Sequence, residues 1–422
     1  MAYSAVKGGQ EAVAESIRLL EKYRAAGQAD LNLEALEKGL GFLIDRIMGE
    51  AGFYAPSYAA LALKQSAGSL EEAVFLLRAY RSTLSRSYLS LPLDGADMRI
   101  LRRVSAAFKD IPGGQFLGAT FDYTHRLLNF DLADNFDLVN TNAHANETPK
   151  AGSDKTAPPE QAAVEGRDIK ARRVSQELRK EGLINTGNDD QGSGDLDPGD
   201  QDPWDITEEP LAFPSPRSAR LQTLARADTG YISGLAYAAI RGFGPGHPTV
   251  GELRTGTLEV SIPHPLIQGE KLFVGDIMVT EVESLFPEEE EETKRKAKED
   301  PLRIMASGQG DKADTSFNSM GLGLGYGMVF GRNDTKAIAM SILDYSLNTM
   351  STGSGEDPGS ANTGGGKSGG ASILENQEFV LLHGDCLEMN GFISHLKLPH
   401  YVTFQSKLDR VRHTRKKTRS PS

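Results

Sequence analysis

Three polar, turn-rich stretches interrupt this chain and limit the folds that it can adopt. They run from Thr141 to about Pro203, from Pro287 to about residue 318, and from Ser351 to about residue 374. Such segments bury too little apolar surface to offset the entropy of ordering them, and looping them out of a folded body costs little. We therefore expect a body whose patterned segments are separated by three insertions.

The patterned segments predict an α+β fold. From Gly9 to about Leu89, apolar residues recur at spacings of three and four, which is typical of amphipathic helices, and Ser69 with Glu72 fits a capping box. The last of these helices is expected from roughly Ser69 to Leu89. Three arginines fall mostly on the face opposite its apolar residues: Arg78, Arg81 and Arg86. Later segments predict helices at 221–240 and 336–347, and strands at 257–262, 271–283 and 378–382.

The expected organisation is therefore a helical N-terminal region followed by a mixed α/β body. In order, we expect the helical region at 1–140, a disordered acidic insertion at 141–209, the body at 210–350 with an insertion at about 287–318, a Gly/Ser-rich insertion at 351–374, the C-terminal part of the body at 375–409 and a basic tail at 410–422. A basic tail of this kind is usually solvated.

Charge and composition exclude several classes of protein. The net charge is -12 over 422 residues, which disfavours a nucleic-acid-binding protein, although much of the acidity lies in the polar stretches. Cys386 is the only cysteine, so no intrachain disulfide can form. No run of about 18 apolar residues occurs, as a membrane span would require, so we expect a soluble cytoplasmic protein.

The first segment that could carry chemistry runs from Asp110 to Arg126. Gly113 and Gly114 can expose backbone amides as an anion-binding nest. Asp122 and His125 could then supply acid-base function, and Arg126 could hold a phosphate. The alternative is a turn followed by a helix that Asp122 caps, with His125 in a structural role.

The second segment, 241–256, is a glycine-rich stretch that holds four polar candidates: Arg241, His247, Glu252 and Arg254. Loops positioned by a scaffold often carry function, so we take His247 as a catalytic candidate and the other three as substrate-binding candidates. A plain connector with surface charges is the alternative.

The third segment, Gly321 to Arg332, is rich in glycine but lacks the nucleotide-binding signatures. Position 328 is Met, so GxGxxG is not formed, and no GxxxxGK[ST] occurs. Close packing of the backbone at a strand is the expected use of these glycines.

The fourth segment holds His395 and His400, five residues apart across a proline. Two imidazoles can converge on one metal if the chain turns, but zinc needs further ligands. These could come from Asp385, His383, Glu388, the substrate or a partner chain. The alternative is two structural histidines.

Six segments together resemble the PhnI family, the I subunit of the carbon-phosphorus lyase core complex. They are AVKGGQEAVAESIRLLEKYR, LALKQSAGSLEEAVFLLRAYRSTL, FKDIPGGQFLGATFDYTHRLLNF, RGFGPGHPTVGELRTG, GYGMVFGRNDTKAIAMSILD and GFISHLKLPHYVTFQ, in the family's order. The resemblance implies a subunit that works with the G, H and L subunits on MgATP and an alkylphosphonate. Together these subunits are expected to form the ribose 1-alkylphosphonate 5-triphosphate and to release adenine.

The resemblance also implies a nucleosidase activity, partners that include the J and K subunits, and zinc bound by the histidines that match His395 and His400. Breaking the N-glycosidic bond requires hydrogen bonding or protonation of the base and a hold on the triphosphate and Mg²⁺. Two alternatives stay open: a non-catalytic architectural subunit, and a simple purine nucleotide hydrolase recruited from the family.

Overall fold

The computed structural model describes residues 9–25, 31–129, 172–184, 203–243, 247–289, 320–352 and 386–419. Within these ranges the fold is α+β, as expected: helices pack around a four-stranded antiparallel sheet in the order β1-β2-β3-β4. No helix in the described ranges is long and apolar enough to cross a membrane.

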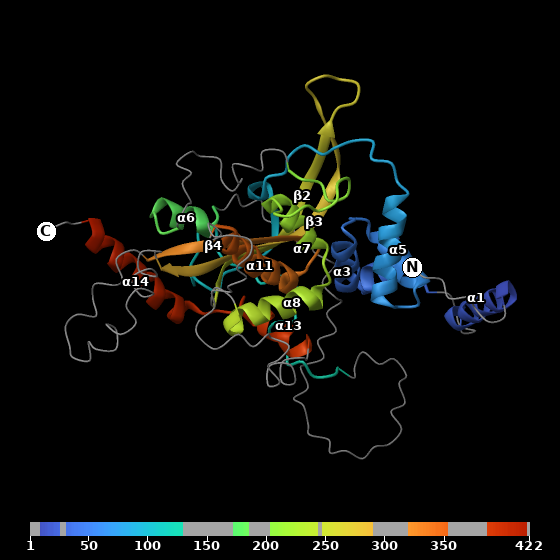
Figure 1. Cartoon of the computed structure of the whole chain (residues 1–422), viewed down its shortest axis with the longest axis horizontal. Coiled ribbons are helices and arrows are strands. Elements are labelled where there is room, and N and C mark those ends of the chain that lie inside the picture. The colour runs from blue at the N-terminus through green and yellow to red at the C-terminus, as the bar shows by residue number, and fades with distance from the viewer. Residues whose placement is uncertain are drawn as a thin grey trace, which may run out of the picture.

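The sheet is built around one long hairpin. β2 (Thr249–Pro263) pairs with β3 (Lys271–Glu289), and the hairpin projects well beyond the body (Figure 1). The short β1 (Arg99–Val104) pairs with β2, while β4 (Met320–Phe330) pairs with β3. The hairpin thus forms the centre of the sheet.

Helices α7 (Arg217–Arg226), α8 (Thr229–Ala238), α11 (Asp334–Thr352) and α13 (Cys386–His395) accompany the sheet, with a π-helical turn at Ala239–Phe243. Their apolar residues and those of the strands form the largest core cluster, which includes Leu253, Val282, Phe286, Ile338 and Ile342. The segment expected to be one helix at 221–240 is therefore two helices that meet at Asp228, the N-cap of α8.

The glycines of β4 allow α11 to lie directly on the sheet. A Cβ on Gly325 would overlap the carbonyl oxygen of Ser341, and one on Gly327 would overlap that of Ala337. The expectation of close backbone packing at a strand is confirmed.

The N-terminal helices are α1 (Gly9–Ala25), α2 (Leu33–Gly39), α3 (Gly41–Ala51), α4 (Pro56–Gln65) and α5 (Leu70–Ser82). Helices α3 to α5 share a core of their own, which includes Ile47, Ala60 and Leu77. The Ser69 hydroxyl accepts a hydrogen bond from the Glu72 amide, so the predicted cap is present. Asp45 of α3 pairs with Arg332 and thereby joins these helices to the sheet.

Two expected boundaries are wrong. The region 1–140 is not only helical, because β1 lies within it and belongs to the sheet. The segment 141–209 contains helix α6 (Val174–Lys180), which buries Val174 and Leu178 together with Leu183 and Ile184. Four apolar residues at suitable spacing are enough to dock this short helix within an otherwise polar stretch.

The C-terminal part also differs from expectation. Helix α14 (Tyr401–Arg419) continues through most of the expected basic tail, because Val411 is buried and Arg412 pairs with Glu181. In the second expected insertion, β3 extends to Glu289 and β4 begins at Met320. The strand expected at 378–382 and the Gly/Ser-rich stretch after residue 352 lie outside the described residues.

The packing of α11 on β4 makes Gly327→Ala strongly destabilising. The added methyl group meets backbone rather than a flexible side chain, so we expect a loss of about 1–3 kcal/mol in the free energy of unfolding, measured by urea denaturation. Gly391→Ala is the matched control: its Cβ meets nothing within 4 Å, and alanine favours the helix. Equal effects of the two substitutions would contradict this packing.

Candidate functional site

Three histidines from distant parts of the chain gather beside Phe392. His247 immediately precedes β2, His395 ends α13, and His400 precedes α14. The ring centroids of His395 and His400 are 5.4 Å apart, and Phe392 lies 4.7 Å from His395 and 6.2 Å from His247. The expected convergence of His395 and His400 is therefore found, and His247 joins them; we call these three the histidine cluster.

Backbone carbonyls fix the tautomer of every ring in the histidine cluster. Nδ1 of His247 lies 2.9 Å from the Pro248 carbonyl oxygen, Nδ1 of His400 lies 2.6 Å from that of Leu398, and Nδ1 of His395 bonds that of Phe392. A carbonyl can only accept, so each Nδ1 donates, and in the neutral ring Nε2 keeps its lone pair. Burial lowers the pKa of His247 and of His395, which favours the neutral form.

These free Nε2 atoms suit a metal, since an imidazole that ligates through one nitrogen usually donates its other N–H to an acceptor. In the part of the chain that the structure describes, however, no three His, Cys, Asp or Glu side chains are grouped to hold a metal ion. His383 and Asp385 lie outside the described residues, as does the side chain of Glu388. A zinc ion on His395 and His400 would therefore need ligands from those residues, a substrate or a partner.

Arg241 places a positive charge next to the histidine cluster. Its guanidinium carbon lies 5.5 Å from the ring centroid of Tyr237 and 5.9 Å from that of Phe392, and the residue is exposed. Phe392 also contacts two of the histidines, so Arg241 and the cluster share one surface. An anion bound there would meet both.

Asp122 lies in a buried network that reaches the histidine segment. Its carboxylate pairs with Arg102 at 2.6 Å and with Lys397 at 2.9 Å, and Lys397 also pairs with Asp334 at 2.9 Å. Burial opposes ionisation, but the hydrogen bond and charge of Lys397, together with Arg102, hold the pKa of Asp122 below its usual range. An ionised Asp122 can orient Lys397 but has no proton to donate.

The rest of the first segment forms a turn that is open to solvent. Gly113 and Gly114 have φ values of 87° and 80°, and the Gly114 amide already bonds the Ile111 carbonyl at 2.9 Å. His125 and Arg126 are exposed, and the guanidinium carbon of Arg126 lies 5.9 Å from the ring centroid of Phe121. The alternative of a helix capped by Asp122 is wrong, since residues 125–129 form no regular element.

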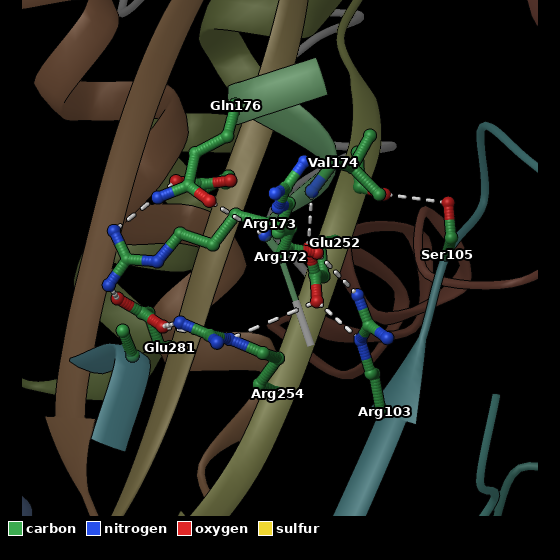
Figure 2. Close-up of polar contacts among 12 residues, drawn as sticks. Arg103, Ser105, Arg172, Arg173, Val174, Gln176, Glu252, Arg254 and Glu281 are labelled. Carbon is green, nitrogen blue, oxygen red and sulfur yellow. Dashed lines mark hydrogen bonds and ion pairs between the residues drawn. The ribbon is translucent and has the colours of Figure 1, made fainter. Parts of the chain in front are cut away.

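Glu252 and Arg254 occupy a strand rather than a loop. Figure 2 shows both within a buried network on β2: Glu252 accepts from Arg103 at 2.6 Å and from the Val174 amide at 2.8 Å, and Arg254 bonds Glu281 at 3.0 Å. Their charges are thus satisfied inside the protein. The sequence alone did not reveal this, because charged residues and glycines in a strand look like a loop.

The strand register places a second carboxylate, Glu283, opposite Glu252, and Glu281 opposite Arg254. Arg173, at the start of α6, bonds Glu281 at 2.8 Å and lies 3.6 Å from Glu283. Burial raises the pKa of Glu283 to about 7, and the neighbouring carboxylates add to the rise. Sequence analysis missed this residue; the alternation Glu281-x-Glu283 facing Glu252-x-Arg254 was the available signal.

The pKa of Glu283 makes stability depend on pH. The unfolded chain loses this proton near pH 4.5 and the folded chain near pH 7, so the free energy of unfolding falls as pH rises between these values. Glu283→Gln should remove this dependence and be more stable than wild type by about 3 kcal/mol at pH 8, with no difference near pH 4. Urea denaturation across this range tests it; Glu259→Gln, exposed on β2, is the control. If the free energies of unfolding of wild type and Glu283→Gln differed by the same amount at every pH, the raised pKa of Glu283 would be contradicted.

Comparison with known proteins identifies relatives along the whole chain. Residues 2–418 match the family described as bacterial phosphonate metabolism protein (PhnI). A putative C-P lyase subunit protein HtxH of Stutzerimonas stutzeri is 40% identical, over 99% of this chain and 97% of its own. Two proteins named alpha-D-ribose 1-methylphosphonate 5-triphosphate synthase subunit PhnI are similar: that of Rhizobium meliloti at 37% identity (98% and 95% covered) and that of Escherichia coli at 38% (96% and 96%). The chain therefore belongs to the PhnI family of phosphonate metabolism proteins.

Proposed function

We propose that this protein is a subunit of an alpha-D-ribose 1-methylphosphonate 5-triphosphate synthase. It would act in the transfer of the ribose 5-triphosphate of MgATP to an alkylphosphonate with release of adenine. The observation that carries the proposal is full-length similarity to two proteins of that name, at 37–38% identity. The G, H and L subunits are the proposed partners in this step, with J and K in the wider complex, and the cytoplasm is the proposed location.

The histidine cluster with Arg241 is the proposed reaction surface. Displacement at C1′ builds positive charge on the ribose and negative charge on the leaving adenine, so the surface must hold phosphoryl oxygens and hydrogen-bond the base. Arg241 and Arg126 are exposed and suited to phosphoryl oxygens. Glu252 and Arg254 support the sheet, because their charges are already paired.

Of the three candidate proton donors, we favour His125. Asp122 is ionised, and His247 is neutral with only a lone pair at Nε2. His247 therefore suits a hydrogen-bond acceptor, whereas exposed His125 is available to solvent and substrate. Gly113 can approach an anion closely because it lacks a side chain, and one amide of its turn is already used within the protein.

Zinc is proposed on His395 and His400, completed by a partner, the substrate or residues beyond the described ranges. The ion would supply a fixed positive charge and hold these segments in register with the partner. The protein's own contribution is the orientation of both imidazoles by the carbonyls of Phe392 and Leu398. Mg²⁺ would enter with ATP.

An architectural role has one specific observation in its favour. The tip of the β2–β3 hairpin exposes Leu266, Ile267, Phe273 and Val274. In Figure 1 this tip lies far from α13, the helix that His395 ends. Exposed apolar side chains grouped in this way mark interaction surfaces. The hairpin would serve assembly whether or not this chain also carries the chemistry.

Adenine release separates the two roles. The purified chain is incubated with MgATP, alone and with G, H and L subunits, with and without methylphosphonate, and adenine and ribose products are measured by chromatography. We expect adenine and ribose 5-triphosphate from the chain alone, and a ribose 1-phosphonate with partners and methylphosphonate. No release in any mixture would leave the architectural role.

The proposed metal site makes a second prediction. His395→Ala and His400→Ala should each lower the zinc content of the purified complex and reduce turnover by at least about tenfold. Zinc is measured by mass spectrometry of the metal. His413→Ala is the control, because His413 is exposed on α14. Full zinc content in both variants would leave the pair as structural histidines.

A further inference from the structure

Three arginines meet where the N-terminal helices contact the body. Arg78 and Arg81 come from α5, and Arg226 is the last residue of α7. A Cβ on Gly52 would lie 2.9 Å from the Arg226 side chain and 3.3 Å from Arg81 Nη1, so these two side chains flank the same point. Arg78 donates to the Arg226 carbonyl at 2.6 Å. We call Arg78, Arg81 and Arg226 the arginine cluster.

The arginine cluster has no carboxylate partner in the part of the chain that the structure describes. Among the described residues no carboxylate oxygen lies within 4 Å of its guanidiniums; Arg78 and Arg81 donate only to backbone carbonyls. Arg226 forms no side-chain hydrogen bond there, and its Nε is buried. Neighbouring Arg86 differs, since it pairs with Asp205 and Glu208. Carbonyls at helix ends explain why Arg78 and Arg81 lie here but do not explain Arg226.

A buried lysine, Lys336, adds to the positive charge of the arginine cluster. Lys336 of α11 is 1% exposed, and its Nζ has no hydrogen-bond partner in the described ranges. The charged groups that face it are Glu50 and Arg46 of α3, Arg78 of α5 and Asp228 before α8. Glu50 already binds Arg46 and Thr229, so it is not an acceptor reserved for Lys336.

The charges at this junction repel one another. Burial, and then the charges of neighbouring arginines, lower the pKa of Arg81 and of Arg226, and the charge of Asp205 opposes this only in part for Arg81. Such an arrangement of planar guanidiniums without a bound carboxylate among the described residues suits phosphoryl oxygens, which arginine binds in a bidentate manner.

We propose that the arginine cluster, with the buried ammonium of Lys336 near Arg78, binds the triphosphate group of a nucleotide. That the ligand is a nucleotide rests on the proposed function. That it carries phosphoryl groups rests on the contacts of the arginines described above. Helix α8 supports the assignment, because its N-terminal cap Asp228 is at this junction and Arg241 of the reaction surface follows its other end. Ten helical residues separate these ends, roughly 15 Å.

The test measures binding without turnover. Calorimetry of the full chain uses tripolyphosphate, ATP without Mg²⁺, orthophosphate and adenosine. We expect tripolyphosphate and ATP to compete, orthophosphate to bind more weakly and adenosine not to compete with tripolyphosphate. Arg226→Gln should weaken tripolyphosphate binding by about tenfold while leaving the melting temperature nearly unchanged, since the Arg226 side chain makes no hydrogen bond among the described residues and the backbone carbonyl that Arg78 binds is kept. Arg86→Gln is the matched control and should bind as wild type does.

Lys336→Met separates binding from structural support. Removing an unpaired buried charge should raise the melting temperature at pH 7 without anion, yet weaken tripolyphosphate binding. Wild-type affinity in both Arg226→Gln and Lys336→Met, or equal loss in Arg86→Gln, would overturn the site. A chain that binds tripolyphosphate but releases no adenine in any mixture would keep this site and refute the proposed function. If the chain released adenine and both Arg226→Gln and Lys336→Met bound ATP as wild type does, the proposed function would stand and this site would be refuted.

Discussion

The register between β2 and β3 is the constraint on which the rest of the structure depends. It places Glu252 opposite Glu283 and Arg254 opposite Glu281, and these buried charges bind arginines from β1 and α6 (Figure 2). Slipping the register by one residue would turn every one of these side chains to the other face. Breaking a buried pair is costly because the remaining charge has no water to solvate it. The network therefore specifies which segments meet, including α6 from within the polar stretch.

Helix α8, which packs beside this sheet, has a positively charged group of residues at each end. The C-terminal side carries Arg241 and the histidine cluster, and the N-terminal side carries the arginine cluster. In the first, backbone carbonyls orient each imidazole through its Nδ1. The second is held by the ends of α3 and α7. A net acidic chain thus concentrates unpaired positive charge where a phosphorylated substrate would bind.

Much of this was predictable from the sequence, for physical reasons. Helical periodicity located α3 to α5 and α11, and the glycines of β4 predicted close backbone packing. The approach of His395 to His400 followed from the turn at Pro399. Glu252 and Arg254 were misplaced because a strand whose buried face holds paired charges breaks the apolar alternation on which strand prediction depends. The sequence did not indicate that Lys336 and Arg226 belong to a binding site, since the charged residues that face Lys336 and the arginines that flank Arg226 lie more than a hundred positions away in the chain.

We propose that this chain itself holds the nucleotide. The most direct measurement is the structure of the assembled complex with a non-hydrolysable ATP analogue and methylphosphonate. We expect phosphoryl density at Arg81 and Arg226, with the ribose directed toward Arg241 and the histidine cluster. A nucleotide bound only on a partner subunit, with both places on this chain empty, would contradict it.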